Sequence, residues 1–134
     1  MRALVTGGGG FLGRYIVERL LERGDQVRTY SRSDYPELRA AGVEIVRGDL
    51  ADAAAVAAAC RGIDCVFHAA AKAGIWGSWN EYYQTNTVGT QAVVAGCHAH
   101  RVPRLVFSSS PSVTFDGQDQ LAVDESAPYD SRWM

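Results

Sequence analysis

The sequence lacks several features that mark specialised classes of protein. It has no run of about 18 apolar residues, so we expect no membrane-spanning helix. Its formal net charge is only −2, which gives no reason to expect a nucleic acid or an anionic membrane surface as partner. The three cysteines, Cys60, Cys65 and Cys97, contain no C-x-x-C pair and predict buried, reduced thiols in a cytoplasmic protein. No group of His, Cys and Asp residues has metal-site spacing, so no metal is expected.

The composition that remains is that of a single globular domain. With 134 residues, of which 47% are hydrophobic, the chain is long enough to bury a core. We expect no secretory leader, because the glycines at positions 7–10 interrupt any apolar segment near the N-terminus.

The most informative segment is the glycine-rich stretch TGGGGFLG at residues 6–13. It lies between a short apolar run and an amphipathic segment, and Gly7, Gly10 and Gly13 have the G-x-x-G-x-x-G spacing. Strand, glycine turn and helix in this order are typical of a dinucleotide pyrophosphate site. We expect Gly7 to permit the tight turn, Gly10 to let a phosphate approach the backbone, and Gly13 to let the helix pack against the sheet. The first-turn N–H groups and the helix dipole would then face the anion.

Strands and helices alternate along the chain. The pattern predicts strands at residues 2–6, 26–31, 43–47, 64–68 and 104–108, and helices at 11–23, 36–41, 53–60 and 80–100. Asp52 is expected to cap the alanine-rich third helix. Short apolar strands indicate a sheet covered by helices on both faces. Right-handed crossovers then give an α/β fold, a Rossmann-type doubly wound parallel sheet.

Five motifs in this order make nearly the whole chain similar to the extended short-chain dehydrogenase/reductase family, which includes the NAD-dependent epimerases and dehydratases. Besides the glycine turn they are GDL at 48–50, VFHAA at 66–70, NTVGT at 86–90 and FSSS at 107–110. Within that family, residues 71–79 resemble those of 2-alkyl-3-ketoalkanoate reductases and of 3-beta-hydroxysteroid dehydrogenase-like proteins.

The resemblance implies a set of cofactor contacts. In the family, the Asp of GDL bonds the adenine amino group, the HAA residues lie along the cofactor, and the Asn of NTVGT helps to organise the active site. These roles carry over to Asp49, to residues 68–70 with His68 contributing backbone contacts, and to Asn86. The expected cofactor-binding residues are Gly7, Gly9, Gly10, Phe11, Leu12, Gly13, Arg32, Asp49, Leu50, Ala69, Ala70, Ala71, Asn86 and Ser108.

The end of the second predicted strand favours NADP(H) and leaves NAD(H) as the alternative. NAD enzymes place an acidic residue there to bind the ribose 2′-OH, but that position falls on Ser31, followed by Arg32. A guanidinium pairs well with a 2′-phosphate, with Ser31 and Ser33 as added donors and Arg14 as a second candidate. Two alternatives stay open: Arg32 is a solvated surface charge, or Asp34, about 20 residues past the glycine turn, is an NAD-type acid. We expect Asp34 instead to cap the following helix.

Family members oxidise or reduce a carbonyl with a Ser, a Tyr and a Lys. The Ser corresponds to Ser110, with Ser112 as a secondary substrate contact; the alternative is a hydroxyl that only bonds the local backbone. The Tyr-x-x-x-Lys pair is absent, because Lys72 is the only lysine and His68 stands four residues before it. We therefore expect residues 1–134 to be the N-terminal NAD(P)-binding Rossmann domain of a longer reductase, incomplete, without its substrate subdomain, and inactive alone.

Aromatic residues follow the fourth predicted strand, at Trp76, Trp79, Tyr82 and Tyr83. They are expected either to wall an apolar substrate pocket or to pack beneath a subdomain that this chain lacks.

The resulting hypothesis is an NADP(H)-dependent reductase of a ketone in a small apolar molecule such as a 2-alkyl-3-ketoalkanoate. The alternatives are a 3-beta-hydroxysteroid dehydrogenase, a nucleotide-sugar epimerase or dehydratase, and a non-catalytic NADP(H)-binding protein. The resemblance also implies a homodimer for the full-length protein, formed through the helix at 80–100.

Overall fold

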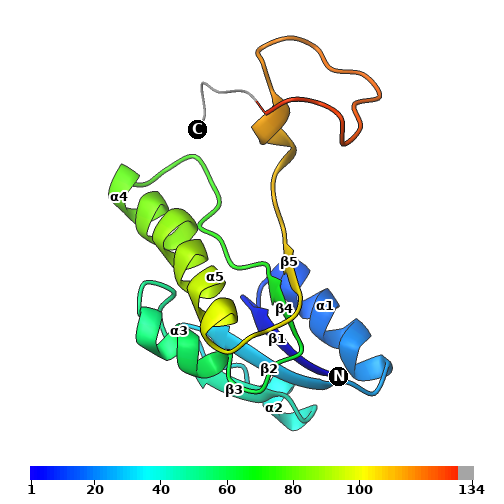
Figure 1. Ribbon diagram of the computed structural model, residues 1–134, viewed down its shortest axis with the longest axis vertical. Helices are drawn as coiled ribbons and strands as arrows, with labels where there is room; N and C mark the ends of the chain where they lie inside the picture. The colour runs from blue at the N-terminus through cyan, green and yellow to red at the C-terminus, as the bar shows by residue number, and fades with distance from the viewer. Residues whose placement is uncertain (130–134) are drawn as a thin grey trace.

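The computed structural model describes residues 1–129 and contains one parallel sheet in the order β3-β2-β1-β4-β5 (Figure 1). The strands are β1 Arg2–Thr6, β2 Gln26–Ser31, β3 Glu44–Arg47, β4 Cys65–His68 and β5 Leu105–Phe107. This order confirms the predicted Rossmann-type doubly wound sheet. The strand order reverses between β1 and β4, which is where folds of this class bind nucleotides.

Helices lie on both faces of the sheet. They are α1 Phe11–Glu22, α2 Pro36–Ala40, α3 Ala53–Ala59, α4 Trp79–Tyr82 and α5 Gly89–Ala99, with a π-helix η1 at Tyr83–Val88 and a 3₁₀ helix η2 at Pro111–Thr114. Figure 1 shows α1 on one side of the strands and the pair α3 and α5 on the other. None of the helices in the described residues is long and apolar enough to cross a membrane.

Two hydrophobic clusters hold the layers together. Leu4 of β1 belongs to the cluster under α3 and α5, whereas Ala3 and Val5 belong to the cluster under α1 and α2. Side chains alternate between the two faces of a strand, so β1 is buried on both faces. This strand carries the glycine turn at its carboxyl end and fixes that turn to the centre of the sheet.

The predicted helix at 80–100 differs from the structure. The observed helical segment begins at Trp79, where Ser78 and Glu81 form a capping box. It is then interrupted by the π-helix η1 before α5 begins. The S-x-x-E pattern was available in the sequence as a start signal. The predicted cap of α3 is confirmed, because the Asp52 carboxylate accepts from the N–H of Ala55 at 3.0 Å.

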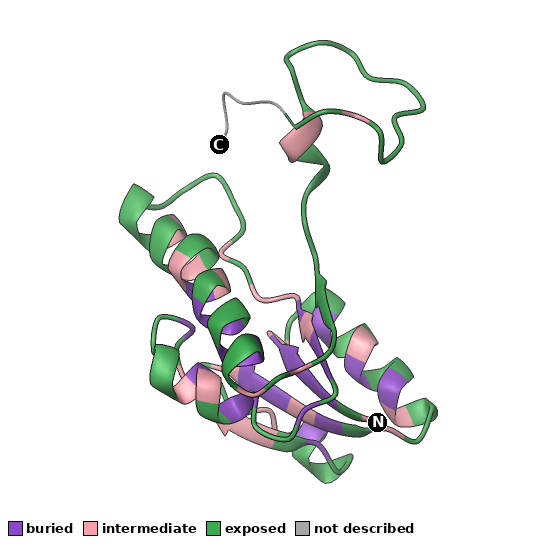
Figure 2. Cartoon of the chain, in the orientation of Figure 1, coloured by how far each residue is buried: buried purple, intermediate pink, exposed green. Residues whose placement is uncertain are grey.

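The expectation that helices cover both faces of the sheet is wrong for β5. Val106 and Phe107 are 51% and 54% exposed, and no part of β5 is buried within the described residues. After β5 the chain runs away from the sheet as an exposed segment that includes η2 (Figures 1 and 2). The apolar pattern of residues 105–107 predicted the strand correctly, but strand patterning does not say which elements cover it.

Candidate functional site: a cavity at the carboxyl ends of the strands

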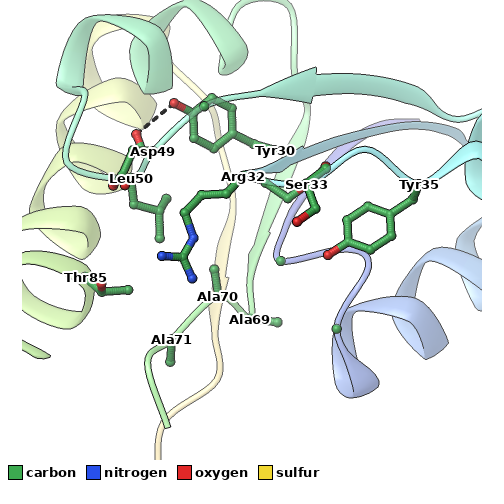
Figure 3. A pocket seen from close by; sticks show the side chains of 14 residues that line it. Tyr30, Arg32, Ser33, Tyr35, Asp49, Leu50, Ala69, Ala70, Ala71 and Thr85 are labelled. Carbon is green, nitrogen blue, oxygen red and sulfur yellow. Dashed lines mark hydrogen bonds between the residues drawn. The ribbon is translucent and has the colours of Figure 1, made fainter. Parts of the chain in front are cut away.

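A cavity of about 290 Å³ opens where β1 to β4 end (Figure 3). Its walls come from the turns that follow these four strands and from the π-helix. The lining residues are Gly7, Gly10, Tyr30, Ser31, Arg32, Ser33, Tyr35, Gly48, Asp49, Leu50, Ala69, Ala70, Ala71 and Thr85. Most of the residues predicted from the sequence at these four strand ends therefore meet in one place.

The glycine turn is tight at Gly7, as predicted, but Gly13 packs differently from the prediction. Gly7 adopts φ +70°, which favours glycine, and its N–H donates to the carbonyl of Tyr30 at 3.0 Å. A Cβ on Gly13 would overlap the carbonyl oxygen of Gly7, so Gly13 packs against the turn itself rather than against the sheet. The N–H of Arg14 makes a helical bond to the carbonyl of Gly10 at 2.9 Å, which leaves the first-turn amides of α1 without helical partners. Such amides can bind an anion.

Arg32 extends from the end of β2 into the cavity (Figure 3). Its guanidinium makes no hydrogen bond or ion pair with any residue in the described range 1–129. Asp34 does not line the cavity. Its carboxylate accepts from Arg39 at 2.8 Å and from the N–H of Tyr35 at 3.1 Å, and the Arg39 bond lowers the pKa of Asp34. The prediction that Asp34 caps α2 is wrong, because Tyr35 is the N-cap and makes no side-chain cap bond.

The other predicted donors near Arg32 have different environments. Arg14 lies outside the cavity, where it pairs with Glu18 of α1 at 3.6 Å and Glu37 of α2 at 3.5 Å. The Ser31 hydroxyl donates to the carbonyl of Ser33 at 3.0 Å, so its proton is already used. Ser33 also lines the cavity (Figure 3).

Asp49 forms the opposite wall from Tyr35 (Figure 3). The buried Tyr30 hydroxyl donates to the backbone carbonyl of Asp49 at 2.9 Å, and the Asp49 carboxylate accepts from the N–H of Ala51 at 2.9 Å. Burial, with Asp52 and Asp49 nearby, raises the pKa of Tyr30, so the hydroxyl remains a donor. Both contacts fix the orientation of a carboxylate that can accept from an amino group.

His68 does not line the cavity; its ring is buried beneath it. Its Nε2 lies 2.9 Å from the Thr90 hydroxyl, which donates its own proton to the carbonyl of Asn86 at 2.7 Å. Thr90 therefore accepts from Nε2–H, and Nδ1 accepts from the Thr6 hydroxyl at 2.6 Å. Thr6 in turn accepts from the N–H of Ala70 at 3.3 Å. Burial lowers the pKa of His68, which keeps this ring neutral.

Asn86 holds the loop after β4 rather than facing the cavity. Its side-chain oxygen accepts from the N–H of Lys72 at 2.7 Å, and its amide nitrogen donates to the Lys72 carbonyl at 3.0 Å. The neighbouring Thr85 lines the cavity instead. Asn86 thus fixes the strand-to-helix loop that contains Ala71.

Ser110 lies outside the cavity, on the exposed segment after β5. Its Oγ accepts from the N–H of Ser112 at 3.2 Å and lies 3.1 Å from the Ser112 hydroxyl. These contacts are the local bonding that the sequence left as an alternative. Ser108 likewise does not line the cavity, although its N–H extends the sheet by donating to the carbonyl of His68 at 3.1 Å.

The remaining sequence candidates fall into two groups. Trp76 and Trp79 are exposed and do not line the cavity, and Trp79 stacks on Tyr83 with ring centroids 6.1 Å apart. All three cysteines are free and buried, and burial raises the pKa of Cys60 to about 12. No cluster of His, Cys, Asp or Glu in residues 1–129 could hold a metal ion.

Sequence reasoning missed four lining residues, Tyr30, Tyr35, Gly48 and Thr85. A Cβ on Gly48 would overlap the ring of Tyr30, so this glycine makes room for the tyrosine. The sequence signal was that Gly48 begins the GDL motif and that Tyr30, Tyr35 and Thr85 each adjoin a residue already singled out.

Comparison with known proteins gives a consistent result. The model of the family described as "3-beta hydroxysteroid dehydrogenase/isomerase family" matches residues 4–134. The chain is 56% identical over 132 residues to a 2-alkyl-3-oxoalkanoate reductase of Stenotrophomonas maltophilia, covering 96% of this chain and 40% of that protein. It is 46% identical to the reductase of the same name from Shewanella oneidensis, covering 98% and 34%. The chain therefore spans well under half the length of these curated relatives.

Solved structures show the same likeness. A UDP-glucose-4-epimerase from Stenotrophomonas maltophila with bound NAD superposes with a TM-score of 0.85 at 29% identity, covering 97% of this chain and 43% of that one. The UDP-glucose 4-epimerase of Thermus thermophilus in complex with NAD gives 0.84 at 32% identity, covering 97% and 44%.

Proposed function

The chain belongs to the 3-beta hydroxysteroid dehydrogenase/isomerase family, and from that premise we propose that the protein containing it is an NADP(H)-dependent ketoreductase. We propose a small apolar substrate of the 2-alkyl-3-oxoalkanoate class, because the two reductases compared above carry that name at 56% and 46% identity. The steroid dehydrogenase and nucleotide-sugar epimerase functions are the alternatives within the same fold.

The observation that carries the cofactor proposal is the guanidinium of Arg32 after β2, which has no hydrogen-bond or ion-pair partner within residues 1–129. A ribose 2′-OH needs an acceptor there, whereas a 2′-phosphate needs donors and positive charge. The carboxylate that follows β2 in the sequence, Asp34, already binds Arg39 and lies outside the cavity lining. These residues fit NADP(H) better than the NAD held by the two epimerases.

The remaining residues fit the rest of a dinucleotide. The first-turn amides of α1 would bind the pyrophosphate, with Gly10 letting the phosphate approach. The Asp49 carboxylate would accept from the adenine amino group. Ala69, Ala70 and Ala71 offer small side chains along the path between them. When bound, the nicotinamide supplies the hydride for carbonyl reduction.

For the carbonyl itself we propose Ser110 as the orienting hydroxyl, which requires it to exchange its bond with Ser112 for one to the substrate. The chain contains no Tyr-x-x-x-Lys pair to supply the proton. We therefore propose that residues 1–134 alone bind NADPH without oxidising it in the presence of a ketone, and absorbance at the NADPH band is the assay.

The test of the cofactor proposal is a fluorescence titration of the chain with NADPH and with NADH. Tighter binding of NADPH is expected, and Arg32→Asp should remove or reverse that preference, because it replaces a cation with an anion. Arg61→Asp is the control of equal charge change, since Arg61 is exposed and does not line this cavity. Equal binding of the two cofactors by the unmodified chain contradicts the proposal.

A further inference from the structure

We propose that Tyr35 is a specificity-determining residue whose hydroxyl, together with that of Ser33, binds the ribose 2′-phosphate opposite Arg32. This inference rests on the proposed NADP(H) site and adds to it a contact that neither the motifs nor the comparisons assign.

The ring of Tyr35 is packed directly on the glycine turn. The three atoms nearest to an ideal Cβ on Gly9 all belong to this ring, and each would overlap that Cβ. Gly9 is not among the residues with positive φ, so its backbone conformation does not require glycine. The space for the Tyr35 ring does require it. The glycine run of residues 7–10 therefore serves two purposes: Gly7 allows a tight turn, and Gly9 leaves room for the Tyr35 ring to pack on the turn.

The backbone of Tyr35 is held as firmly as its ring. Its N–H donates to the Asp34 carboxylate at 3.1 Å, and its carbonyl accepts from Leu38 at 3.0 Å and Arg39 at 3.1 Å at the start of α2. The side chain also packs against the cluster under α1 and α2. Because the ring is packed on Gly9 and the backbone is hydrogen-bonded, the Tyr35 hydroxyl points in one direction. Binding a ligand through it should therefore cost little further conformational entropy of the side chain.

The hydroxyl of Tyr35 has no hydrogen-bond partner within residues 1–129, although the residue lines the cavity. The same is true of the Ser33 hydroxyl and of the Arg32 guanidinium. Figure 3 shows both hydroxyls on the cavity side of this segment. Three side chains within four residues thus offer donors that have no acceptor in the described part of the chain.

The chemistry of this donor set selects a phosphate. A tetrahedral dianion takes several donors at once, and bonds to charged groups are the stronger kind. The pyrophosphate is expected on the first-turn amides of α1, which already supply its donors. The end of β2 is where folds of this class contact the ribose, so the 2′-phosphate is the group that Tyr35 and Ser33 can reach.

The test uses adenosine 2′,5′-bisphosphate and 5′-AMP, which differ only in the 2′-phosphate, in calorimetric titrations of the chain. Tyr35→Phe keeps the ring on Gly9 and removes only the hydroxyl. It is expected to weaken binding of the bisphosphate by about tenfold, the effect of one hydrogen bond to a charged group, and to leave 5′-AMP binding unchanged. Tyr15→Phe on exposed α1, outside this cavity, is the matched control and should change neither.

The outcomes separate this inference from the proposal beneath it. If the unmodified chain does not prefer the bisphosphate, both are overturned. If it does prefer the bisphosphate, and Arg32→Ala abolishes the preference while Tyr35→Phe leaves it unchanged, only the role of Tyr35 is overturned. If Tyr35→Phe weakens the binding of both ligands equally, the role of Tyr35 is also overturned, since its hydroxyl would then affect adenosine binding or the fold.

Discussion

The ends of β2 and β5 are both carboxyl ends of parallel strands in one sheet, yet they are built differently. After β2, Tyr35 is packed on Gly9 and its backbone is bonded on both sides. After β5, the hydroxyl of Ser110 contacts only Ser112, two residues away, and the strand itself is exposed. The chain therefore fixes Tyr35, a residue proposed to bind the cofactor. Within residues 1–129, it does not fix the residue proposed to bind the carbonyl.

The largest loss of stability is expected from Gly13→Ala, at the glycine turn on which Tyr35 packs. The new Cβ would overlap backbone atoms of Gly7 and Gly8, which cannot move aside as a side chain can. We expect a loss of about 3 kcal/mol or more in the free energy of unfolding, from overpacking. Urea denaturation measures it.

The control for that variant is Gly24→Ala, where φ is +80° but no atom lies within 4 Å of the added Cβ. Its expected cost is about 1–2 kcal/mol, from left-handed backbone alone. If both variants lose the same amount, close packing at the turn is not what Gly13 provides.

The next largest effect is expected from the buried hydrogen bonds of Thr6, His68 and Thr90. His68→Ala removes one of the two hydrogen bonds of each hydroxyl of Thr6 and Thr90 and should cost about 2–3 kcal/mol in unfolding free energy. His68 has a folded pKa below its unfolded value, so its contribution is complete above about pH 6.5 and is lost as pH falls below that.

A pH series of urea denaturations checks the sign. The unmodified chain should lose more stability between about pH 7 and pH 5 than His68→Gln does. His98→Gln, at the exposed end of α5, should keep the slope of the unmodified chain. A slope that is identical in all three proteins would remove His68 from the pH dependence.

A smaller loss of stability is expected from a variant that tests the packing of the Tyr35 ring on Gly9. Gly9→Ala should cost about 1–2 kcal/mol, because the new Cβ meets the ring. In a Tyr35→Ala background the same change should cost much less, so the double-mutant cycle should give a coupling of about 1 kcal/mol. Additive costs would place the ring away from Gly9.

The smallest effect is expected at the end of β5. Ser110→Ala removes an exposed hydroxyl with one local partner and should change the unfolding free energy by no more than about 0.5 kcal/mol. NADPH affinity in the titration above should also be unchanged. A loss of several kcal/mol would mean that this segment is packed more firmly than its contacts indicate.

Local sequence patterns predicted the fold well, because in most of its strands and helices the spacing of apolar residues distinguishes a strand from a helix. The positions of β1, β2 and the cap at Asp52 follow from the neighbouring residues alone. The π-helical turn in the predicted helix at 80–100 was missed, since residues 83–88 have no glycine or proline to mark it. The exposure of β5 was missed because covering is a tertiary property.

The site was predictable in its motifs and not in its side-chain partners. Arg32 and Asp49 both line the cavity, because strand ends in a parallel sheet share one edge. The prediction that Asp34 caps α2 failed because Tyr35 is the N-cap, and the Asp34 carboxylate binds the Arg39 side chain. Tyr35 was missed because its contact with Gly9 joins residues 26 positions apart, which no local pattern records.

The most direct test of the account is a crystal structure of this chain with NADP⁺. It should place the pyrophosphate at the first turn of α1, the adenine amino group at Asp49, and the 2′-phosphate between Arg32 and the hydroxyls of Ser33 and Tyr35. A 2′-phosphate in solvent, with a ribose hydroxyl bonded to Asp34, would contradict it.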